Sequence, residues 1–219
     1  MLYTLEQVKD NLRTRQGSRV FFLGEGDRLT SAAKDFLSAE RIPILPASQA
    51  KIHRYEGLDG AYYEEKPEHM TQLEGNILVP KTHPRIRLRG KLDSLQAQVI
   101  LLILEEPELQ KPLEEILELL RRMLKNEVLG EPFVFGQLFG KSEQEIREIS
   151  QQPQKHLGIP HFMLGPKDGK TIARLNCLRT LVREAELLAV ETGREDLTRG
   201  LNRLSSAVYI LMLQRKGST

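Results

Sequence analysis

The sequence predicts a mainly α protein, a bundle of four to five helices that follows a small N-terminal α/β unit. Long segments after residue 84 repeat apolar side chains at intervals of three and four, which is the period of an amphipathic helix. Aromatic residues make up only 5% of the 219 residues and tryptophan is absent, whereas leucine is abundant. This composition favours packed helices over a β-sandwich or barrel. Short connections between the helical segments indicate a bundle.

The first 45 residues are predicted to be the small α/β unit. Helical spacing and two short apolar runs indicate a helix with Leu5, Val8 and Leu12, a strand at Val20–Leu23, a helix capped by Thr30 and carrying Ala33, Phe36 and Leu37, and a strand at Ile42–Ile44. Residues 46–70 are polar and rich in turn-forming residues, so we predict a linker there. The helical domain then covers residues 71–219.

The helical domain is predicted from apolar stripes and from their start and stop signals. Pro84 suits the first turn of a helix whose stripe is Ile86, Leu88, Leu92, Leu95, Val99 and Leu102. Pro107 opens a second helix, with Leu109, Leu113, Ile116, Leu117, Leu120, Met123 and Leu124 at the same spacing. Ser142 and Glu145 form a capping box for a short helix. Two long helices, near residues 168–192 and 196–215, close the chain and are divided by Gly193.

Charge and cysteine content argue against several classes of function. Basic residues number 32 and acidic residues 30, so the formal net charge of +2 offers no general attraction for nucleic acid or an anionic membrane. The single cysteine, Cys177, excludes a disulfide framework and fits a reducing compartment. Its place beside Leu178 predicts a core position. The sequence contains no apolar run long enough for export or membrane insertion, so we expect a cytoplasmic protein.

The most unusual pattern is a polar face on the penultimate helix. Steps of three, four and three place Asn176, Arg179, Arg183 and Glu186 on one side of that helix. Two guanidinium groups on one face repel each other, so they require an anionic neighbour or an anionic ligand. The alternative is a solvated face with weak ion pairs, each worth a few tenths of a kcal/mol.

Two further segments carry candidate site residues. The last helix contains Arg199, Asn202, Arg203 and Ser206, with Gly200 inside it, where glycine costs ~1 kcal/mol relative to alanine and indicates a close approach of a neighbouring group. Residues 81–91 are strongly basic and include Lys81 and Arg85. Asp93 follows, between Leu92 and Leu95, and an acid on an apolar stripe requires a partner. An arginine from another helix, such as Arg179, is its natural partner.

Other catalytic and metal-binding patterns receive little support. GPKDGKT, from Gly165 to Thr171, has three residues between its glycines where a phosphate loop has four, and an ordinary loop-to-helix junction fits it better. The five histidines show neither His-Glu-x-x-His nor Glu-x-x-His, and no metal site can be assembled from their spacing. Gly-x-Ser-x-Gly is also missing from the sequence, which argues against a serine hydrolase.

Three motifs in order resemble the ATP:cob(I)alamin adenosyltransferases. KTHPRIRLRGKLDSL is similar to the family's Lys-x-Asp-Pro-Arg-Val…Gly-x-x-Asp-x-Leu, HFMLG…RLNCLRTLVREAE to its Phe-Ile-Leu-Pro…Arg-x-x-x-Arg-Arg-Ala-Glu, and LNRLSS to its Asn-Arg-Leu-Ser-Asp. They span residues 71–215. DRLTSAAKDFL ahead of the bundle resembles the ethanolamine-utilisation branch, which is related to the propanediol-utilisation type.

The resemblance implies roles for individual residues. Asp93 would form a salt bridge with Arg179 between subunits, and Arg183 would hold the triphosphate of ATP. Glu186 and Asn202 would shape the site at a subunit boundary. The other implied positions are Lys81 and Arg85 at the nucleotide, and Phe162, Asn202 and Ser206 at the corrinoid, with Phe162 as the aromatic ring beneath the corrin.

The resemblance also implies ligands, assembly and location. ATP and cobalamin are the expected substrates and Mg²⁺ is the expected cofactor. The expected assembly is a homo-oligomer, with a trimer favoured, and the expected location is the cytoplasm, in association with a bacterial microcompartment. Ser206 stands where the family has an aspartate, and the family's glycine-rich nucleotide loop is replaced by EEKPEHMTQLEGN. Two other functions stay open: a non-catalytic helical adaptor of an ethanolamine or propanediol pathway, and a P-loop phosphotransferase that depends on Lys170.

Overall fold

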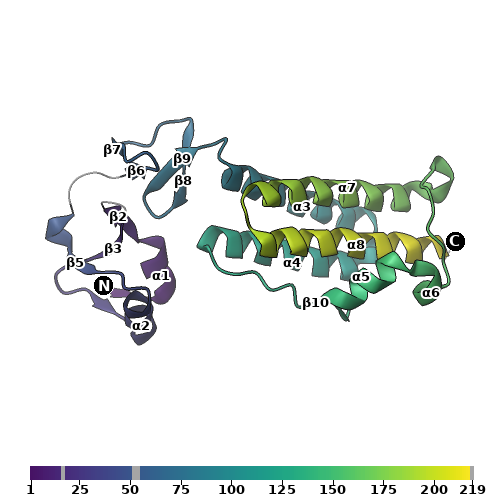
Figure 1. Ribbon diagram of the computed structural model, residues 1–219, viewed down its shortest axis with the longest axis horizontal. Coiled ribbons are helices and arrows are strands. Elements are labelled where there is room, and N and C mark those ends of the chain that lie inside the picture. Colours follow the sequence, from purple (N-terminus) through teal and green to yellow (C-terminus); the bar gives the residue numbers. More distant parts are fainter. Residues whose placement is uncertain (16–17, 51–54, 218–219) are drawn as a thin grey trace. The chain divides into compact units, whose positions relative to one another are not determined.

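The computed structural model describes residues 1–15, 18–50 and 55–217. The chain divides into two compact units, Met1–His83 and Pro84–Thr219. Figure 1 shows strands and short helices in the first unit and long helices in the second. The predicted fold class, mainly α with an N-terminal α/β part, is therefore confirmed.

The first part of the N-terminal unit is a small α/β fold with its own apolar core. Its elements are β1 (Leu2–Tyr3), α1 (Leu5–Asp10), β2 (Arg13–Arg15), β3 (Ser18–Leu23), β4 (Arg28–Leu29), α2 (Ser31–Ala39), β5 (Ile44–Pro46) and the short 3-10 helix η1 (Ala47–Gln49). Strand β3 lies between antiparallel β2 and parallel β5. The predicted cap of α2 is present, because the hydroxyl of Thr30 accepts a hydrogen bond from the amide of Ala33. Val8, Phe21 and Leu37 are buried in this core.

The second part of this unit is a four-stranded sheet in the order β7-β6-β9-β8. The strands are β6 (Tyr55–Gly57), β7 (Tyr62–Tyr63), β8 (Met70–Glu74) and β9 (Ile77–Pro80). Residues 46–70, where we expected a linker, thus contribute strands to this sheet, and the division between the units follows His83 instead of residue 70. Residues 51–54 of the expected linker lie outside the described residues. Strands of two or three residues are too short to show a period in the sequence.

The C-terminal unit is a helical bundle. Its elements are α3 (Pro84–Glu105), η2 (Pro107–Leu109), α4 (Gln110–Leu129), β10 (Gln137–Leu138), β11 (Lys141–Ser142), α5 (Glu143–Gln151), α6 (Pro153–Leu157), η3 (Pro166–Asp168), α7 (Gly169–Glu191) and α8 (Glu195–Gly217). Helix α7 packs along α8 and also contacts α3, which in turn packs on α4, and the shorter α5 contacts α8 (Figure 1). Five of these helices match the predicted bundle.

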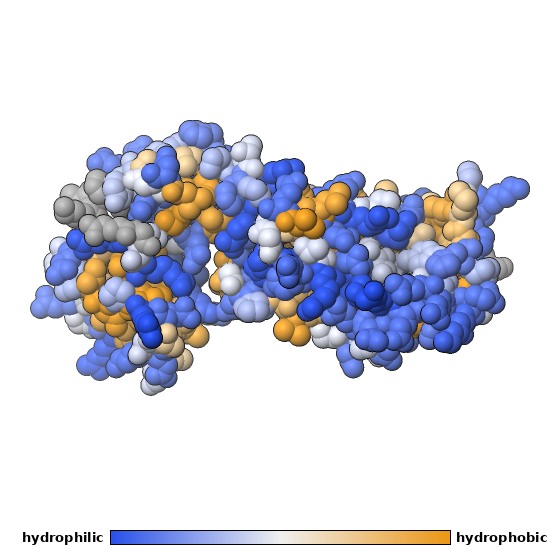
Figure 2. Space-filling model, viewed as in Figure 1, coloured by the Kyte–Doolittle hydropathy of each residue, from blue (hydrophilic) through white to orange (hydrophobic). Residues whose placement is uncertain are grey.

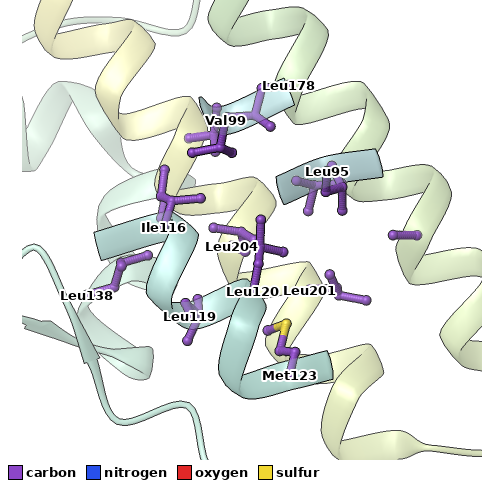
Figure 3. Close-up of a cluster of buried hydrophobic side chains, with 14 of the residues drawn as sticks. Leu95, Val99, Ile116, Leu119, Leu120, Met123, Leu138, Leu178, Leu201 and Leu204 are labelled. Carbon is purple, nitrogen blue, oxygen red and sulfur yellow. The ribbon is translucent and has the colours of Figure 1, made fainter. Parts of the chain in front are cut away.

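One continuous apolar core holds the bundle together. The predicted stripes supply it, since Leu95 and Val99 from α3, Ile116, Leu120 and Met123 from α4, Leu178 from α7, and Leu201 and Leu204 from α8 are buried together (Figure 3). Each fully buried leucine or isoleucine contributes ~1.5–3 kcal/mol relative to an exposed one. The spacing of three and four places these residues on one face of each helix, which explains why the helices associate by those faces.

Local signals set the ends of the helices as predicted. The Ser142 hydroxyl accepts from the Glu145 amide and the Glu145 carboxylate accepts from the Ser142 amide, so the capping box begins α5. Gly193, with a φ of 70°, lies in the turn between α7 and α8. A Cβ on Gly200 would lie 2.7 Å from the ring of Phe133 and 2.8 Å from the methyl group of Met123. The predicted close approach at Gly200 is therefore confirmed, and its cause is packing.

One prediction about burial is wrong. Cys177 is exposed, not a core residue, because it lies between the buried positions Leu175 and Leu178 of α7 but on another face of the helix. Asp93, which interrupts the apolar stripe of α3 in the sequence, is exposed as well, because the buried positions Leu92 and Leu95 lie on a neighbouring face. Sequence adjacency to a buried leucine does not place a residue on the same face of a helix.

The face of the bundle that Figure 2 shows is mainly hydrophilic, with separate apolar patches. None of the described helices has the length and hydropathy needed to span a membrane. GPKDGKT forms the 3-10 turn η3 and the first turn of α7, and helix α6 is the element before it. The carboxylate of Asp168 in this segment accepts from the Gly165 amide at 2.6 Å and pairs with Lys216. The prediction of a loop-to-helix junction is confirmed.

Candidate functional site

A pocket of about 430 Å³ lies between the end of α7 and the first turns of α8. Two residues that sequence analysis singled out, Glu186 and Asn202, form part of its wall. The Asn202 side-chain amide donates to the Glu186 carboxylate at 2.9 Å. Sequence spacing placed these residues on two separate helices, and the packing of α7 on α8 brings them together. The remaining lining residues are Val190, Gly193, Glu195, Thr198 and Arg199.

The amide of Asn202 has a second partner on its own helix. The guanidinium of Arg203 donates to the Asn202 amide oxygen at 2.6 Å. Arg203 also lies 3.6 Å from the carboxylate of Glu143, which is the first residue of α5, and Arg199 lies 3.2 Å from the same carboxylate. Glu143 was not among the predicted site residues. Glu143 of helix α5 therefore contacts two arginines of α8, and one of them, Arg199, lines the pocket.

The two arginines of the α7 face differ in their surroundings. Arg179 is half-buried, and its Nε donates to Asn176 at 3.3 Å, whereas Arg183 is exposed. Burial, together with the positive charge of Arg183, lowers the pKa of the Arg179 guanidinium from its ordinary value. The pair thus forms a positively charged face that a bound anion would stabilise.

An aromatic cluster joins Arg179 to Phe162. Tyr209 of α8 stacks on Phe162 with ring centroids 6.4 Å apart, and the guanidinium carbon of Arg179 lies 6.0 Å from the Tyr209 ring centre. The Tyr209 hydroxyl and His161 Nδ1 are 2.9 Å apart, and their rings also stack. Sequence analysis missed Tyr209. Its position seven residues after Asn202, two turns along the same face of α8, was the available signal.

The other predicted site residues lie elsewhere. Asp93 is exposed on α3, and Ser206 is half-buried on α8, one turn beyond Asn202. Lys81 is exposed and belongs to the N-terminal unit, where its amide donates to the carbonyl of His69 at 2.9 Å. Arg85 lies near the start of α3, with its guanidinium occupied by Glu127 of α4.

Glu127 is the centre of a buried ionic network that sequence analysis did not find. Its side chain is fully buried, and its two carboxylate oxygens pair with Arg85, at 2.5 Å, and with Arg89. Arg85 also donates to the backbone carbonyl of Glu127 at 2.6 Å. The available signal was spacing, because Glu127 continues the apolar stripe of α4 after Leu120 and Met123. An acid at such a position requires paired cations.

A second pocket, of about 520 Å³, lies beside this network at the turn between α7 and α8. Arg85 lines it together with Arg194 and Asp196, which are joined by hydrogen bonds of 2.8 and 2.9 Å. The hydrogen bond from Arg194 lowers the pKa of the Asp196 carboxyl well below its ordinary value. Among the described residues, no group of three or more histidine, cysteine, aspartate or glutamate side chains is placed to hold a metal ion.

A model of the cobalamin adenosyltransferase family matches residues 61–214, which include the whole pocket between α7 and α8. The chain belongs to the cobalamin adenosyltransferase family. The resemblance seen in the sequence motifs is thus confirmed. This member of the cobalamin adenosyltransferase family carries Glu186, Asn202 and both arginines of the α7 face within the matched residues.

Curated relatives and solved structures agree with this membership. The chain is 35% identical over 158 residues to the corrinoid adenosyltransferases EutT of Escherichia coli K12 and of Salmonella typhimurium LT2. The matched segment covers 68% of this chain and 59% of the length of either relative. A variant of the PduO-type ATP:corrinoid adenosyltransferase from Lactobacillus reuteri, solved with cobalamin and ATP, shares the fold. The superposition has a TM-score of 0.51 and a sequence identity of 22%. It covers 67% of this chain and 85% of the Lactobacillus reuteri chain.

Proposed function

We propose that this protein transfers the 5′-deoxyadenosyl group of ATP to the cobalt of reduced cobalamin. The observation that carries the proposal is the pocket formed by Glu186 and Asn202, within the residues that the family matches. Because the chain spans 59% of the length of its curated relatives, activity and substrates are inferences from the part that matches. Membership of an enzyme family favours this catalytic function over a helical adaptor.

The reaction forms one bond and breaks one bond. The electron pair of Co(I) in cob(I)alamin attacks C5′ of ATP, a Co–C bond forms, and the C5′–O bond breaks so that the triphosphate leaves with the bonding electrons. The corrinoid substrate supplies the nucleophile, so the protein binds and orients the two substrates and stabilises the leaving group. Several negative charges develop on that leaving group, and arginines are suited to bind them.

Arg183 and Arg179 are the residues we assign to the polyphosphate. Arg183 is exposed and available to a ligand, and Arg179 is half-buried beside it with a lowered pKa caused first by burial and then by the charge of Arg183. An anion between the two guanidinium groups would relieve their repulsion. Glu186 and Asn202 then shape the nucleotide site, and Lys81 is assigned to the same substrate by resemblance to the family's first motif. Arg85, which that motif also implies, has its guanidinium paired with Glu127 and is the weaker candidate.

Phe162 and Ser206 are assigned to the corrinoid. Phe162 is half-buried against the bundle and held by Tyr209 and by Lys216, whose ammonium lies 5.4 Å from the centre of the Phe162 ring. An aromatic ring beneath the corrin would exclude water from the lower face of the cobalt and favour a lower coordination number, which makes the cobalt easier to reduce. Asn202 and Ser206 lie one turn apart on α8 and can line the same substrate.

Mg²⁺ is proposed to arrive with ATP. This ion keeps several waters and binds through one or two carboxylates together with substrate phosphates. Glu186 and Glu195 both line the pocket and provide carboxylates of the required kind. These residues therefore fit a phosphate-bound Mg²⁺, whose charge would assist departure of the triphosphate.

A homo-oligomer, with a trimer favoured, is proposed from the exposed face of α3. Asp93, Ala97, Ile100 and Leu104 follow one another at steps of four, three and four, and all are exposed. Leu104 exposes 73% of its surface and Ile100 43%. An apolar stripe of this kind on a helix marks a contact surface, and Asp93 at its end is available to Arg179 of a neighbouring copy.

The cytoplasm, near a bacterial microcompartment, is the proposed location, and the exposed thiol of Cys177 suits its reducing conditions.

The test is a spectroscopic assay under anaerobic conditions. Purified protein with ATP, Mg²⁺ and chemically reduced cobalamin should convert the visible spectrum of Co(I) to that of adenosylcobalamin, and omission of ATP is the control. An unchanged spectrum in the complete mixture contradicts the proposal.

A thermal shift experiment separates the enzyme from an adaptor. ATP at 100 times its dissociation constant raises the free energy of unfolding of a protein that binds it by ~2.7 kcal/mol, whereas it leaves that of a non-binding adaptor unchanged.

A further inference from the structure

We propose that Glu143 of α5 is a positioning residue for the pocket, acting through Arg203 on the side-chain amide of Asn202. This inference rests on the proposed function, in which Asn202 contacts the substrates. The structural basis is a chain of contacts across three helices: Glu143 to Arg203 at 3.6 Å, Arg203 to Asn202 at 2.6 Å, and Asn202 to Glu186 at 2.9 Å.

The first step is the orientation of the amide. A guanidinium only donates hydrogen bonds, so Arg203 selects the amide oxygen of Asn202. A carboxylate only accepts, so Glu186 selects the amide nitrogen. Both contacts require the same rotamer of the amide. A flipped amide would place a donor against Arg203 and an acceptor against Glu186, and both hydrogen bonds would be lost.

The second step is the dependence of Arg203 on Glu143. The Arg203 side chain is only 14% exposed, so its charge requires an acid nearby. Glu143 is that acid, and it also pairs with Arg199 on the wall of the pocket. Loss of its charge leaves two neighbouring guanidinium groups without their shared counter-ion. Arg203 is then free to turn away from Asn202 toward solvent.

The third step is the rigidity of Glu143 itself. It is the first residue of α5, directly after the cap residue Ser142, and the capping box fixes the backbone there. Ile146 and Ile149 anchor the same helix in the bundle core. The carboxylate is thus presented by a fixed element, which is the arrangement that lets a remote group orient a residue of the site. The Asn202 amide is thus held in one orientation in the wall of the pocket.

The experiment compares Glu143→Gln with Glu148→Gln. Glu148 is an exposed acid on the same helix, bonded to Gln144 at 2.7 Å, and it has no part in the chain of contacts. We expect Glu143→Gln to lower kcat/KM about tenfold and Glu148→Gln to change it less than about twofold, within the range of couplings measured for contacting residues. In an Asn202→Ala background, Glu143→Gln should have almost no further effect, because its target is gone.

The second measurement does not depend on activity. The side-chain amide signals of Asn202, assigned in a ¹⁵N-labelled protein by their loss in Asn202→Ala, should shift in Glu143→Gln and stay in place in Glu148→Gln. Unmoved signals in Glu143→Gln overturn the proposal, as does a loss of kcat/KM that persists in full in the Asn202→Ala background. A wild type that cannot adenosylate cobalamin refutes the proposed function, and the amide signals then still decide whether Glu143 positions Asn202.

Discussion

Removal of the buried carboxylate of Glu127 should strongly destabilise the bundle. Each of its oxygens pairs with a different arginine, and the side chains of Arg85 and Arg89 are only 22% and 14% exposed. Glu127→Ala would remove the carboxylate that both guanidinium groups share, while the two groups stay largely out of water. Breaking a buried ion pair from one side costs ~3–5 kcal/mol. At ~2–4 °C per kcal/mol for a protein of this size, the melting temperature should fall by about 6–20 °C.

The assay is thermal unfolding followed by circular dichroism at a helical wavelength, because the helical signal comes mostly from α3, α4, α7 and α8. Glu118→Ala is the matched control, since Glu118 is exposed on the same helix. It should change the melting temperature by no more than about 2 °C. A Glu127→Ala protein that melts as the control does would refute the argument that the arginines depend on Glu127. The triple change Glu127→Met, Arg85→Met and Arg89→Leu should recover much of the loss, because it buries no unpaired charge.

Three further outcomes are expected. Arg183→Ala should lower kcat at least about 100-fold with an unchanged melting temperature, because an exposed arginine lost from a charge-stabilising site costs catalysis and not folding; equal activity would mean that the polyphosphate site lies elsewhere. Asp93→Ala should weaken assembly, seen as a lower mass in analytical ultracentrifugation, and an unchanged mass would place the subunit contact on another face. Hydrogen bonding from Arg194 lowers the pKa of Asp196, so this pair stabilises the fold above the ordinary pKa of ~3.9 and less as the pH falls below it. The gap in melting temperature between wild type and Asp196→Asn should therefore be full at pH 6 and shrink toward pH 3, and a gap that does not narrow would contradict the pairing.

The helices were predictable because their signals are local and repeated. The stripe through Leu95 and Val99, the capping box of Ser142 and the stop at Gly193 each act within a few residues of chain. The four-stranded sheet of the N-terminal unit was not predictable in this way. Strands such as β7 consist of two residues and exist because β6 pairs with them, and such pairing leaves no period in the sequence.

The candidate site was predictable in part. The residues of the α7 face and of α8 were identified from spacing and from the family's motifs, and Glu186 with Asn202 indeed meet. Tyr209 and Glu143 were missed because each gains its place only from contacts with another helix. Cys177 was placed in the core from its neighbour Leu178, whereas burial depends on which side of the helix a residue occupies.

The sequence by itself determined the helical class, the helix boundaries, the membership of a family and the identity of the charged residues that a nucleotide site requires. The tertiary structure decided which charged side chains are exposed and which are held in buried ion pairs. Arg85 and Arg183 are the same residue type in the sequence, yet Arg85 is paired with a buried acid and Arg183 is exposed. The physical reason is that spacing defines the face of one helix, while the burial and pairing of a charge depend on the other helices that pack against it.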